Sequence, residues 1–183
     1  MNDKPEPFVF ITPRILAPEE QRPSPNRRGP RRMPIDLIVL HATAGAFEGA
    51  ISWLCKADRQ NPTSAHLVVA KDGRIVRLVN DEDEAWHAGN SIWQGRGALN
   101  QRSIGIEIEN SNTGADPYPE VQLETVLSLC ARDCRRYGLN AGNVVGHAHV
   151  APQRKTDPAG FPWPRFYASL AAALTGIEDT PAG

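Results

Sequence analysis

The sequence predicts an α/β domain in which a central mixed β-sheet is flanked by helices. Three observations lead to this fold class. Residues 35–41 form an apolar run rich in branched side chains, as in a buried central strand. Residues 103–110 alternate strictly between the two sides of an extended chain, which is the period of a strand. Residues 120–137 repeat apolar side chains at the spacing of an amphipathic helix. Strands and helices mixed in this order favour a layered α/β domain.

The first 34 residues are rich in proline and arginine and precede the predicted domain. This composition is typical of an extended arm or surface strap without a core of its own. Its arginines are either solvated or a contact surface for a polyanionic partner. Four neighbouring apolar residues are candidates to attach the arm to the domain: Phe8, Val9, Phe10 and Ile11.

The single predicted domain covers residues 35–175, and residues 176–183 are expected to form a flexible tail. After the first central strand, residues 47–56 have helical spacing. Residues 66–70 and 74–79 then predict a β-hairpin, because they are strand-like runs around a turn that contains Gly73.

The second half of the domain begins with the alternating strand at 103–110. The helix predicted over 120–137 is ended by Gly138, a residue that favours the conformation of a helix C-terminus. Residues 143–146 predict a further short strand, and residues 164–174 a closing helix.

The composition argues against several classes of function. The formal net charge of −1 gives no reason to expect a nucleic-acid partner, and aromatic residues at 7% are too sparse for a base-stacking surface. No apolar run is long enough for membrane insertion. The N-terminus lacks the basic start and apolar core of a secretory signal, so we expect cytoplasmic synthesis without a signal peptide. The oligomeric state is left open.

The three cysteines, an odd number, predict no disulfide framework. Cys130 and Cys134 share one face of a predicted helix. They are either a pair of metal ligands or buried small apolar side chains, and the absence of a matching Cys or His pair nearby in the sequence favours burial.

Residues 146–158 bring two histidines, a lysine and an aspartate close together. Pro152 and Pro158 argue against a helix here, so we expect a rigid, irregular loop. His147, Lys155 and Asp157 are residue types that a hydrolytic zinc site needs. The alternative is a polar surface loop with incidental histidines.

Two strands supply further candidates for the same site. His41 lies at the end of the first predicted central strand, and His147 follows a later one. Strand ends at one edge of a sheet are common places for active sites. With Asp157 as third ligand, a zinc-bound water would be a nucleophile, Glu107 its general base and Lys155 the cation for developing negative charge. Glu109 faces the same side as Glu107 and is the rival base.

Four sequence blocks in this order resemble the zinc-dependent N-acetylmuramoyl-L-alanine amidases. This type 2 family also includes phage amidase lysozymes and peptidoglycan recognition proteins. The blocks span roughly residues 35–165 and are IDLIVLHATAG, SAHLVVAKDGRIVRLV with DEDEAWHAGNS, RSIGIEIEN, and VVGHAHVAPQRKTDPAGFPW.

The resemblance implies that residues 35–175 are an amidase catalytic domain with the fold of that family. It implies that His41, His147 and Asp157 bind one zinc ion, with Glu107 as base and Lys155 as oxyanion residue. Phage lysozymes often carry cysteine in place of the aspartate. With aspartate at this position, the chain resembles the bacterial branch of the family, which contains muropeptide-recycling and outer-membrane amidases.

The chain also departs from the family pattern. His149 stands where a small polar or acidic residue is more usual. On an extended segment it would face the same side as His147 and compete with Asp157 for the metal; the alternatives are a contact to a ligand or to the substrate. Ala65 stands where phage lysozymes often carry a catalytic tyrosine.

Several residues are candidates for binding the substrate. His66 either points toward the metal or packs within the sheet. His87 beside Trp86 either lines the substrate groove or is structural. Trp93 and Arg96 suit sugar faces and peptide carboxylates, or belong to an ordinary surface loop. His149 completes this group.

The resemblance implies hydrolysis of the amide bond between N-acetylmuramic acid and L-alanine in peptidoglycan or muropeptides. A phage-type endolysin would act on the cell wall, and a recycling enzyme in the cytoplasm. A non-catalytic peptidoglycan-binding module is the alternative of a different class, although the chain retains every ligand and the base. A zinc peptidase cutting within the stem peptide is a third hypothesis.

Overall fold

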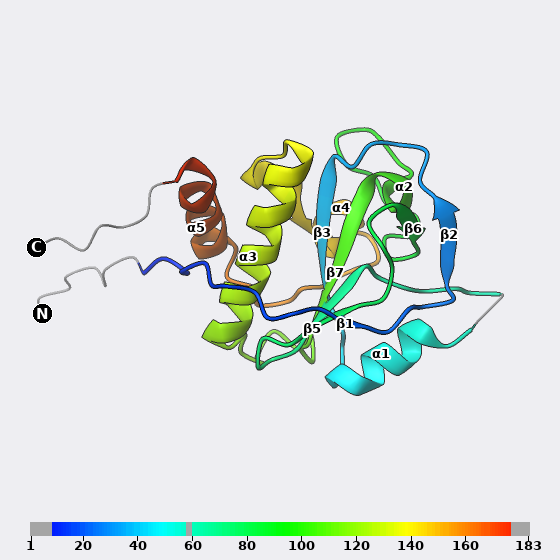
Figure 1. The fold of residues 1–183 in the computed structure, drawn as a ribbon, viewed down its shortest axis with the longest axis horizontal. Coiled ribbons are helices and arrows are strands. Elements are labelled where there is room, and N and C mark those ends of the chain that lie inside the picture. The colour runs from blue at the N-terminus through cyan, green and yellow to red at the C-terminus, as the bar shows by residue number, and fades with distance from the viewer. Residues whose placement is uncertain (1–8, 58–59, 177–183) are drawn as a thin grey trace, which may run out of the picture.

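The computed structural model describes residues 9–57 and 60–176 (Figure 1). Its main sheet contains, in sheet order, β1 (Glu20–Gln21), β5 (Ile75–Arg77), β4 (Leu67–Val69), β7 (Ser103–Ile108), β3 (Leu37–Ala42) and β8 (Val144–Gly146). The four strands from β4 to β8 are parallel, whereas β5 joins β4 in antiparallel orientation. The mixed sheet is therefore confirmed, and so is the hairpin predicted around Gly73.

Helices cover both faces of this sheet. The longer ones in the described part of the chain are α1 (Phe47–Cys55), α3 (Glu120–Tyr137) and α5 (Trp163–Thr175). Helices α3 and α5 lie together on one side of the sheet, and α1 lies on the other (Figure 1). Shorter segments are α2 (Leu99–Arg102), α4 (His147–Val150) and a 3₁₀ turn at Ala141–Asn143. No described helix has the length and apolar character to cross a membrane.

The side chains of β7 point alternately to the two faces of the sheet, as the sequence predicted. Ile104, Ile106 and Ile108 are completely buried in the core beneath α3 and α5. Gly105 and Glu107 point to the opposite face, because successive side chains of a strand alternate. The apolar face anchors the strand, which leaves the other face available for polar groups.

Helix α3 has the predicted bounds. Gly138 ends it in the left-handed conformation at φ 66°, and its N–H bonds to the carbonyl of Cys134. Cys130 and Cys134 are free thiols buried in the core, which confirms the apolar interpretation of this pair.

The N-terminal segment takes part in the sheet structure. Strand β1 pairs with the edge strand β5, and β2 (Arg27–Pro30) forms a second, two-stranded sheet with β6 (Asp83–Ala85). The sequence did not predict either pairing. The division at residue 35 between arm and domain stays a prediction.

The apolar anchors of this segment differ from those expected. Ile11 is 1% exposed, and its N–H donates to Ser169 Oγ at 2.8 Å. The side chains of Val9 and Phe10 are exposed, so the apolar anchor is Ile11 rather than the whole cluster. Phe8 and residues 177–183 of the predicted tail lie outside the described residues.

The predicted irregular loop at 146–158 contains one helical turn, α4, so the expectation of no helix was wrong. Pro152 lies beyond the last residue of this turn, Val150, and therefore removes no hydrogen bond within it. The turn begins directly after β8, which places His147 at the edge of the sheet.

Candidate active site

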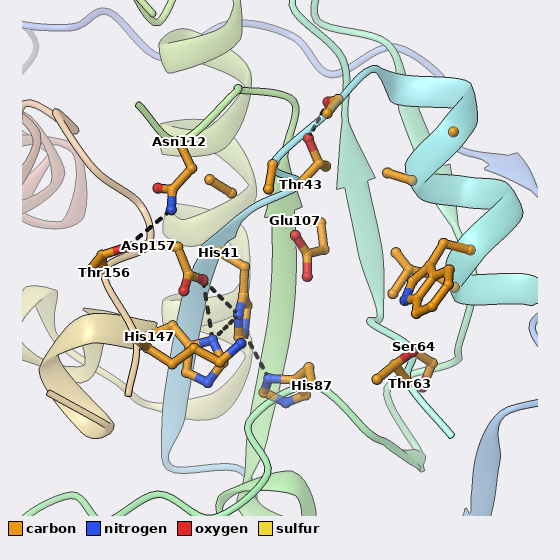
Figure 2. Close-up of a pocket in the computed structure, with 18 of the residues that line it drawn as sticks. His41, Thr43, Thr63, Ser64, His87, Glu107, Asn112, His147, Thr156 and Asp157 are labelled. Carbon is orange, nitrogen blue, oxygen red and sulfur yellow. Dashed lines mark hydrogen bonds and ion pairs between the residues drawn. The ribbon is translucent and has the colours of Figure 1, made fainter. Parts of the chain in front are cut away.

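A cavity of about 530 Å³ opens at the carboxyl ends of the parallel strands (Figure 2). His41 enters it from β3, Glu107 from β7, and His147 from the start of α4. Lys155 and Asp157 line it from the loop that follows α4, and α1 forms the facing wall. The parallel arrangement of the strands thus brings residues from distant parts of the sequence to one edge.

Three ligand atoms meet inside this cavity: His41 Nδ1, His147 Nδ1 and Asp157 Oδ2. The two nitrogens are 2.9 Å apart, and the carboxylate oxygen lies 3.4 Å and 3.2 Å from them (Figure 2). Ligands at the usual zinc distances around a tetrahedral centre lie about 3.3 Å apart. The three buried side chains therefore fit a zinc ion.

Hydrogen bonds at the far side of each ring orient the two histidines. His147 Nε2 lies 3.2 Å from the carbonyl oxygen of Ala88, which can only accept a hydrogen bond. His41 Nε2 lies 3.0 Å from His87 Nδ1. Both Nδ1 atoms consequently face the cluster, as expected of metal-binding imidazoles held by outer partners.

The protonation of the cluster also suits a cation. Burial lowers the pKa of His41 to about 4, although the neighbouring Asp157 opposes this shift. Burial alone would raise the pKa of Asp157, but the two imidazoles that contact its carboxylate, those of His147 and His41, hold it well below its usual range. A neutral imidazole beside an ionised carboxylate is the form in which these residues bind metals.

Glu107 faces the same cavity and has the opposite character. Burial raises its pKa to about 8, the charge of Asp157 adds to the rise, and the ammonium group of Lys155 opposes it. A carboxyl whose pKa lies near neutrality can both accept and return a proton.

Glu109, the rival base, is engaged elsewhere. Its two carboxylate oxygens accept hydrogen bonds from the backbone N–H of Phe47, at 3.0 Å, and of Lys71, at 2.8 Å. The first of these satisfies a free N–H at the start of α1. Glu109 is absent from the cavity lining. Through its two hydrogen bonds it connects α1 to the β-hairpin.

The structure divides the other predicted site residues into two groups. Trp86 and His87 line the cavity. His66 is completely buried in the sheet, where its Nδ1 accepts from the N–H of Gly105 at 2.9 Å. Trp93 and Arg96 are absent from the cavity lining; they pair through their backbones, and Arg96 forms an ion pair with Asp36 at 2.8 Å.

His149 does not converge on the metal cluster. In the helical turn its ring lies 4.7 Å from that of Trp163, and its Nδ1 accepts from the N–H of Gly146. The interpretation of His149 as a rival ligand assumed an extended segment, and the helix overturns that assumption.

Residues 31–160 match the sequence profile of the N-acetylmuramoyl-L-alanine amidase family. The chain belongs to this family. It is 41% identical over 111 residues to the 1,6-anhydro-N-acetylmuramyl-L-alanine amidase AmpD of Enterobacter cloacae, a match that covers 60% of this chain and 58% of AmpD. It is 38% identical over 144 residues to the N-acetylmuramoyl-L-alanine amidase AmiD of Escherichia coli, covering 70% of this chain and 51% of AmiD. The chain thus spans less than two thirds of these relatives' length.

Solved structures of family members have the same fold. A selenomethionine derivative of AmpD superimposes with a TM-score of 0.75 and 32% identity, over 85% of this chain and 96% of the other. AmiD of E. coli, in complex with its substrate anhydro-N-acetylmuramic acid-L-Ala-D-gamma-Glu-L-Lys, gives 0.67 and 35%, over 74% and 57%. A mutant Bacillus subtilis endolysin, at 24% identity and a TM-score of 0.65, shares the fold.

Some residues that line this cavity were not predicted from the sequence. Arg154 lines it, and its guanidinium donates to the carbonyls of Ala88 and Asn90 at 2.6 Å and 2.7 Å. Trp53 of α1 also lines it and is 63% exposed. The sequence signal for Trp53 was that an aromatic residue lies off the apolar face of a predicted helix. The partners of Arg154 could be recognised only once the fold was known.

Proposed function

We propose that this protein is a zinc-dependent N-acetylmuramoyl-L-alanine amidase. The observation that carries the proposal is the meeting of His41, His147 and Asp157 in one cavity with Glu107 and Lys155. These residues come from separate segments, and together they supply three metal ligands, a base and a cation. The reaction would hydrolyse the amide between the lactyl group of N-acetylmuramic acid and L-alanine.

His41, His147 and Asp157 would hold the metal. When bound, zinc supplies a Lewis acid that polarises a carbonyl group and lowers the pKa of water. The remaining steps depend on side chains of the chain itself, and the two groups that perform them line the same cavity.

Glu107 is the proposed general base. It accepts a proton from the attacking water and then donates this proton to the leaving amine of L-alanine, so the carboxyl returns to its starting state. A pKa near 8 before the metal binds marks a carboxyl that releases and takes up protons readily. The positive charge of zinc and of Lys155 would favour its ionised form.

Lys155 is the proposed oxyanion residue. Its ammonium group would stabilise the negative charge that develops on the carbonyl oxygen as water adds to the amide carbon. The opposing effect of Lys155 on the pKa of Glu107 supports this position, because it reflects a positive charge acting within the cavity.

The first test measures metal content and product identity together. Purified protein should contain one zinc ion, and it should release from a muropeptide a peptide whose new N-terminus is L-alanine, as read by mass spectrometry. Removal of zinc by a chelator should abolish turnover, and added zinc should restore it. A cut between two amino acids, or unchanged substrate with zinc-loaded protein, would refute the proposal.

Glu107→Gln provides the matched variant for this assay. It removes the base while preserving the size of the side chain, so we expect a loss in kcat of about 10²- to 10⁴-fold with zinc content unchanged. Near-normal turnover by this variant would exclude Glu107 as the base.

We further propose a soluble anhydro-muropeptide as the preferred substrate. AmpD carries the 1,6-anhydro form in its name, and Asp157 resembles that branch of the family. Comparison of kcat/KM on an anhydro-muropeptide with the rate on intact sacculi tests this preference. Faster cleavage of the soluble fragment fits a recycling enzyme in the cytoplasm, whereas faster digestion of sacculi would reverse the proposal in favour of an endolysin acting on the wall.

A further inference from the structure

We propose that His87 is a positioning residue that fixes His41 in the tautomer able to bind zinc, through a hydrogen-bonded chain that ends at a backbone carbonyl. The chain runs from His41 Nε2 to His87 Nδ1 (3.0 Å), from His87 Nε2 to Ser103 Oγ (3.2 Å), and from Ser103 Oγ to the carbonyl oxygen of Leu99 (2.5 Å). This inference rests on the zinc site of the proposed function.

The carbonyl of Leu99 determines the direction of every bond in the chain. A carbonyl oxygen can only accept, so the hydroxyl proton of Ser103 must point to Leu99. Ser103 Oγ can then only accept from His87, which requires the proton of His87 to be on Nε2.

The same reasoning reaches the metal cluster. With its proton on Nε2, a neutral His87 presents a lone pair at Nδ1 and must accept from His41. His41 is then protonated on Nε2, and its Nδ1 carries the lone pair that faces His147 and Asp157. If the hydrogen bonds ran in the opposite direction, His41 would carry its proton on Nδ1, the atom that must bind the metal.

The chain is isolated from water, which would otherwise offer each ring alternative partners. His41 is 2% exposed, His87 9% and Ser103 0%. If every bond in the chain were reversed, the hydroxyl of Ser103 would donate to His87, and the carbonyl of Leu99 would lose its hydrogen bond from Ser103. An acceptor left unpaired away from water costs free energy, so that arrangement of protons would be costly.

The backbone of β7 provides the space for this arrangement. The ring of His87 lies against Gly105, and a Cβ atom at this position would lie 2.4 Å from His87 Cγ, far inside van der Waals contact. Glycine at residue 105 therefore permits the imidazole to reach between His41 and Ser103.

The two metal-binding histidines are thus fixed in different ways. His147 donates directly to the carbonyl of Ala88. His41 reaches a carbonyl only through two intermediate side chains, so its tautomer can be changed by substitution without alteration of the backbone.

The first experiment observes the tautomers directly in the metal-free wild-type protein. Imidazole ¹⁵N shifts from long-range proton–nitrogen NMR spectra should place the protons of His41 and His87 on Nε2. Ser103→Ala, which removes the acceptor for His87, should shift His87 towards a mixture of tautomers. Protonation of His41 on Nδ1 in the wild type would overturn the inference.

The second experiment compares His87→Asn with His87→Leu, two side chains of similar size. The side-chain oxygen of Asn can take the place of His87 Nδ1 as an acceptor, whereas Leu has no acceptor. Competition with a chelating dye should show zinc binding about 10- to 100-fold weaker in the Leu variant, with the Asn variant close to wild type. If His87 served only in packing, Leu would bind zinc as well as Asn does, and that result would refute the chain.

These readouts separate the inference from the proposed function. If the wild-type protein bound no zinc, the proposed function would fail, yet the NMR measurement on metal-free protein would still decide the chain. If the wild type bound zinc and cleaved muropeptides but the Leu variant bound zinc equally, the chain alone would be refuted.

Discussion

At the scale of single residues, Asp157 and Glu107 show how two carboxyl groups in one cavity acquire opposite properties. Asp157 is buried and Glu107 is half-buried, and this withdrawal from water by itself raises the pKa of each. Asp157 contacts two imidazoles and is held ionised, whereas Glu107 lies near the negative charge of Asp157 and favours its neutral form. The pair therefore suits the two proposed roles, an anionic metal ligand and a group that exchanges protons.

This difference predicts how the stability of the metal-free protein depends on pH. The pKa of Glu107 rises from 4.5 to about 8 on folding, so the folded state binds more protons than the unfolded state between these values. Stability contributed by the protonated carboxyl is present below about pH 4.5 and is lost as pH rises through 8. Glu107→Gln should therefore raise Tm at pH 8–9 by about 2–4 °C for each kcal/mol relieved, and should change little at pH 4.

Glu124→Gln is the control, because Glu124 lies on α3 outside the cavity lining. Thermal unfolding of the chelator-treated variants across this pH range measures the effect. An increase in Tm that was equal at pH 4 and pH 9, or shared by the Glu124 variant, would contradict the assigned cause.

The candidate metal ligands could be predicted from the sequence because their chemistry is distinctive and each follows or lies near a predicted strand. The side-chain pattern alone did not distinguish Glu107 from Glu109, since both share one face of β7, and only the family resemblance favoured Glu107. The physical difference between them is that Glu109 accepts from the backbone N–H groups of Phe47 and Lys71, and these partners are known only from the fold. The orientation of His149 likewise depends on one short helical turn.

At the scale of elements, β7 combines three tasks in six residues. Its isoleucines hold the core, Glu107 faces the cavity, and Gly105 accommodates the ring of His87. Gly105→Ala should force this ring out of place, because the added Cβ would lie 2.4 Å from His87 Cγ. We expect a loss of about 1–3 kcal/mol in unfolding free energy, typical of overpacking, together with weaker zinc binding.

Gly97→Ala is the matched control for this prediction, since its Cβ would meet only an ordinary contact, the carbonyl of Ser91 at 3.8 Å. Chemical denaturation and zinc titration of both variants provide the measurements. Wild-type stability and zinc affinity in Gly105→Ala would show that the strand and ring separate easily, against the close packing described above.

The elements that the sequence did not predict are short or polar. Strand β1 has two exposed residues, and β2 is four exposed residues containing glycine and proline, so neither shows the alternation of a half-buried strand. Helix α4 spans a single turn, which is too short for a helical period. Such elements form because neighbouring strands and loops offer them hydrogen bonds, and only the folded chain shows these neighbours.

At the scale of the whole molecule, the site exists because the parallel sheet brings distant segments to one edge. His41 and His147 are 106 residues apart in sequence, and their ligand atoms are 2.9 Å apart. The order of strands β7, β3 and β8 fixes this approach, and the cores on both faces of the sheet hold it in place.

The N-terminal segment contributes to the same assembly through Arg31. Its guanidinium donates to the carbonyl oxygens of Asp81, Gln101, Asp83 and Ser103, at 2.6 to 3.3 Å. It thereby connects the segment before β3 to the loop before β6 and to the start of β7. Ser103 belongs to the proposed chain to His41, so the arginine also supports the backbone beneath the site.

Arg31→Gln should consequently destabilise the whole protein, because a shorter neutral side chain cannot reach all four carbonyls and leaves buried acceptors unpaired. We expect a loss on the order of 3 kcal/mol, since hydrogen bonds to charged groups contribute about 1.5–3 kcal/mol each and only part of that is recoverable from water. Arg32→Gln removes an adjacent, exposed guanidinium and should leave unfolding unchanged within about 0.5 kcal/mol. Urea denaturation of the two variants distinguishes these effects. Equal stabilities would mean that the N-terminal segment lies on the domain without supporting it, as a strap with no structural role.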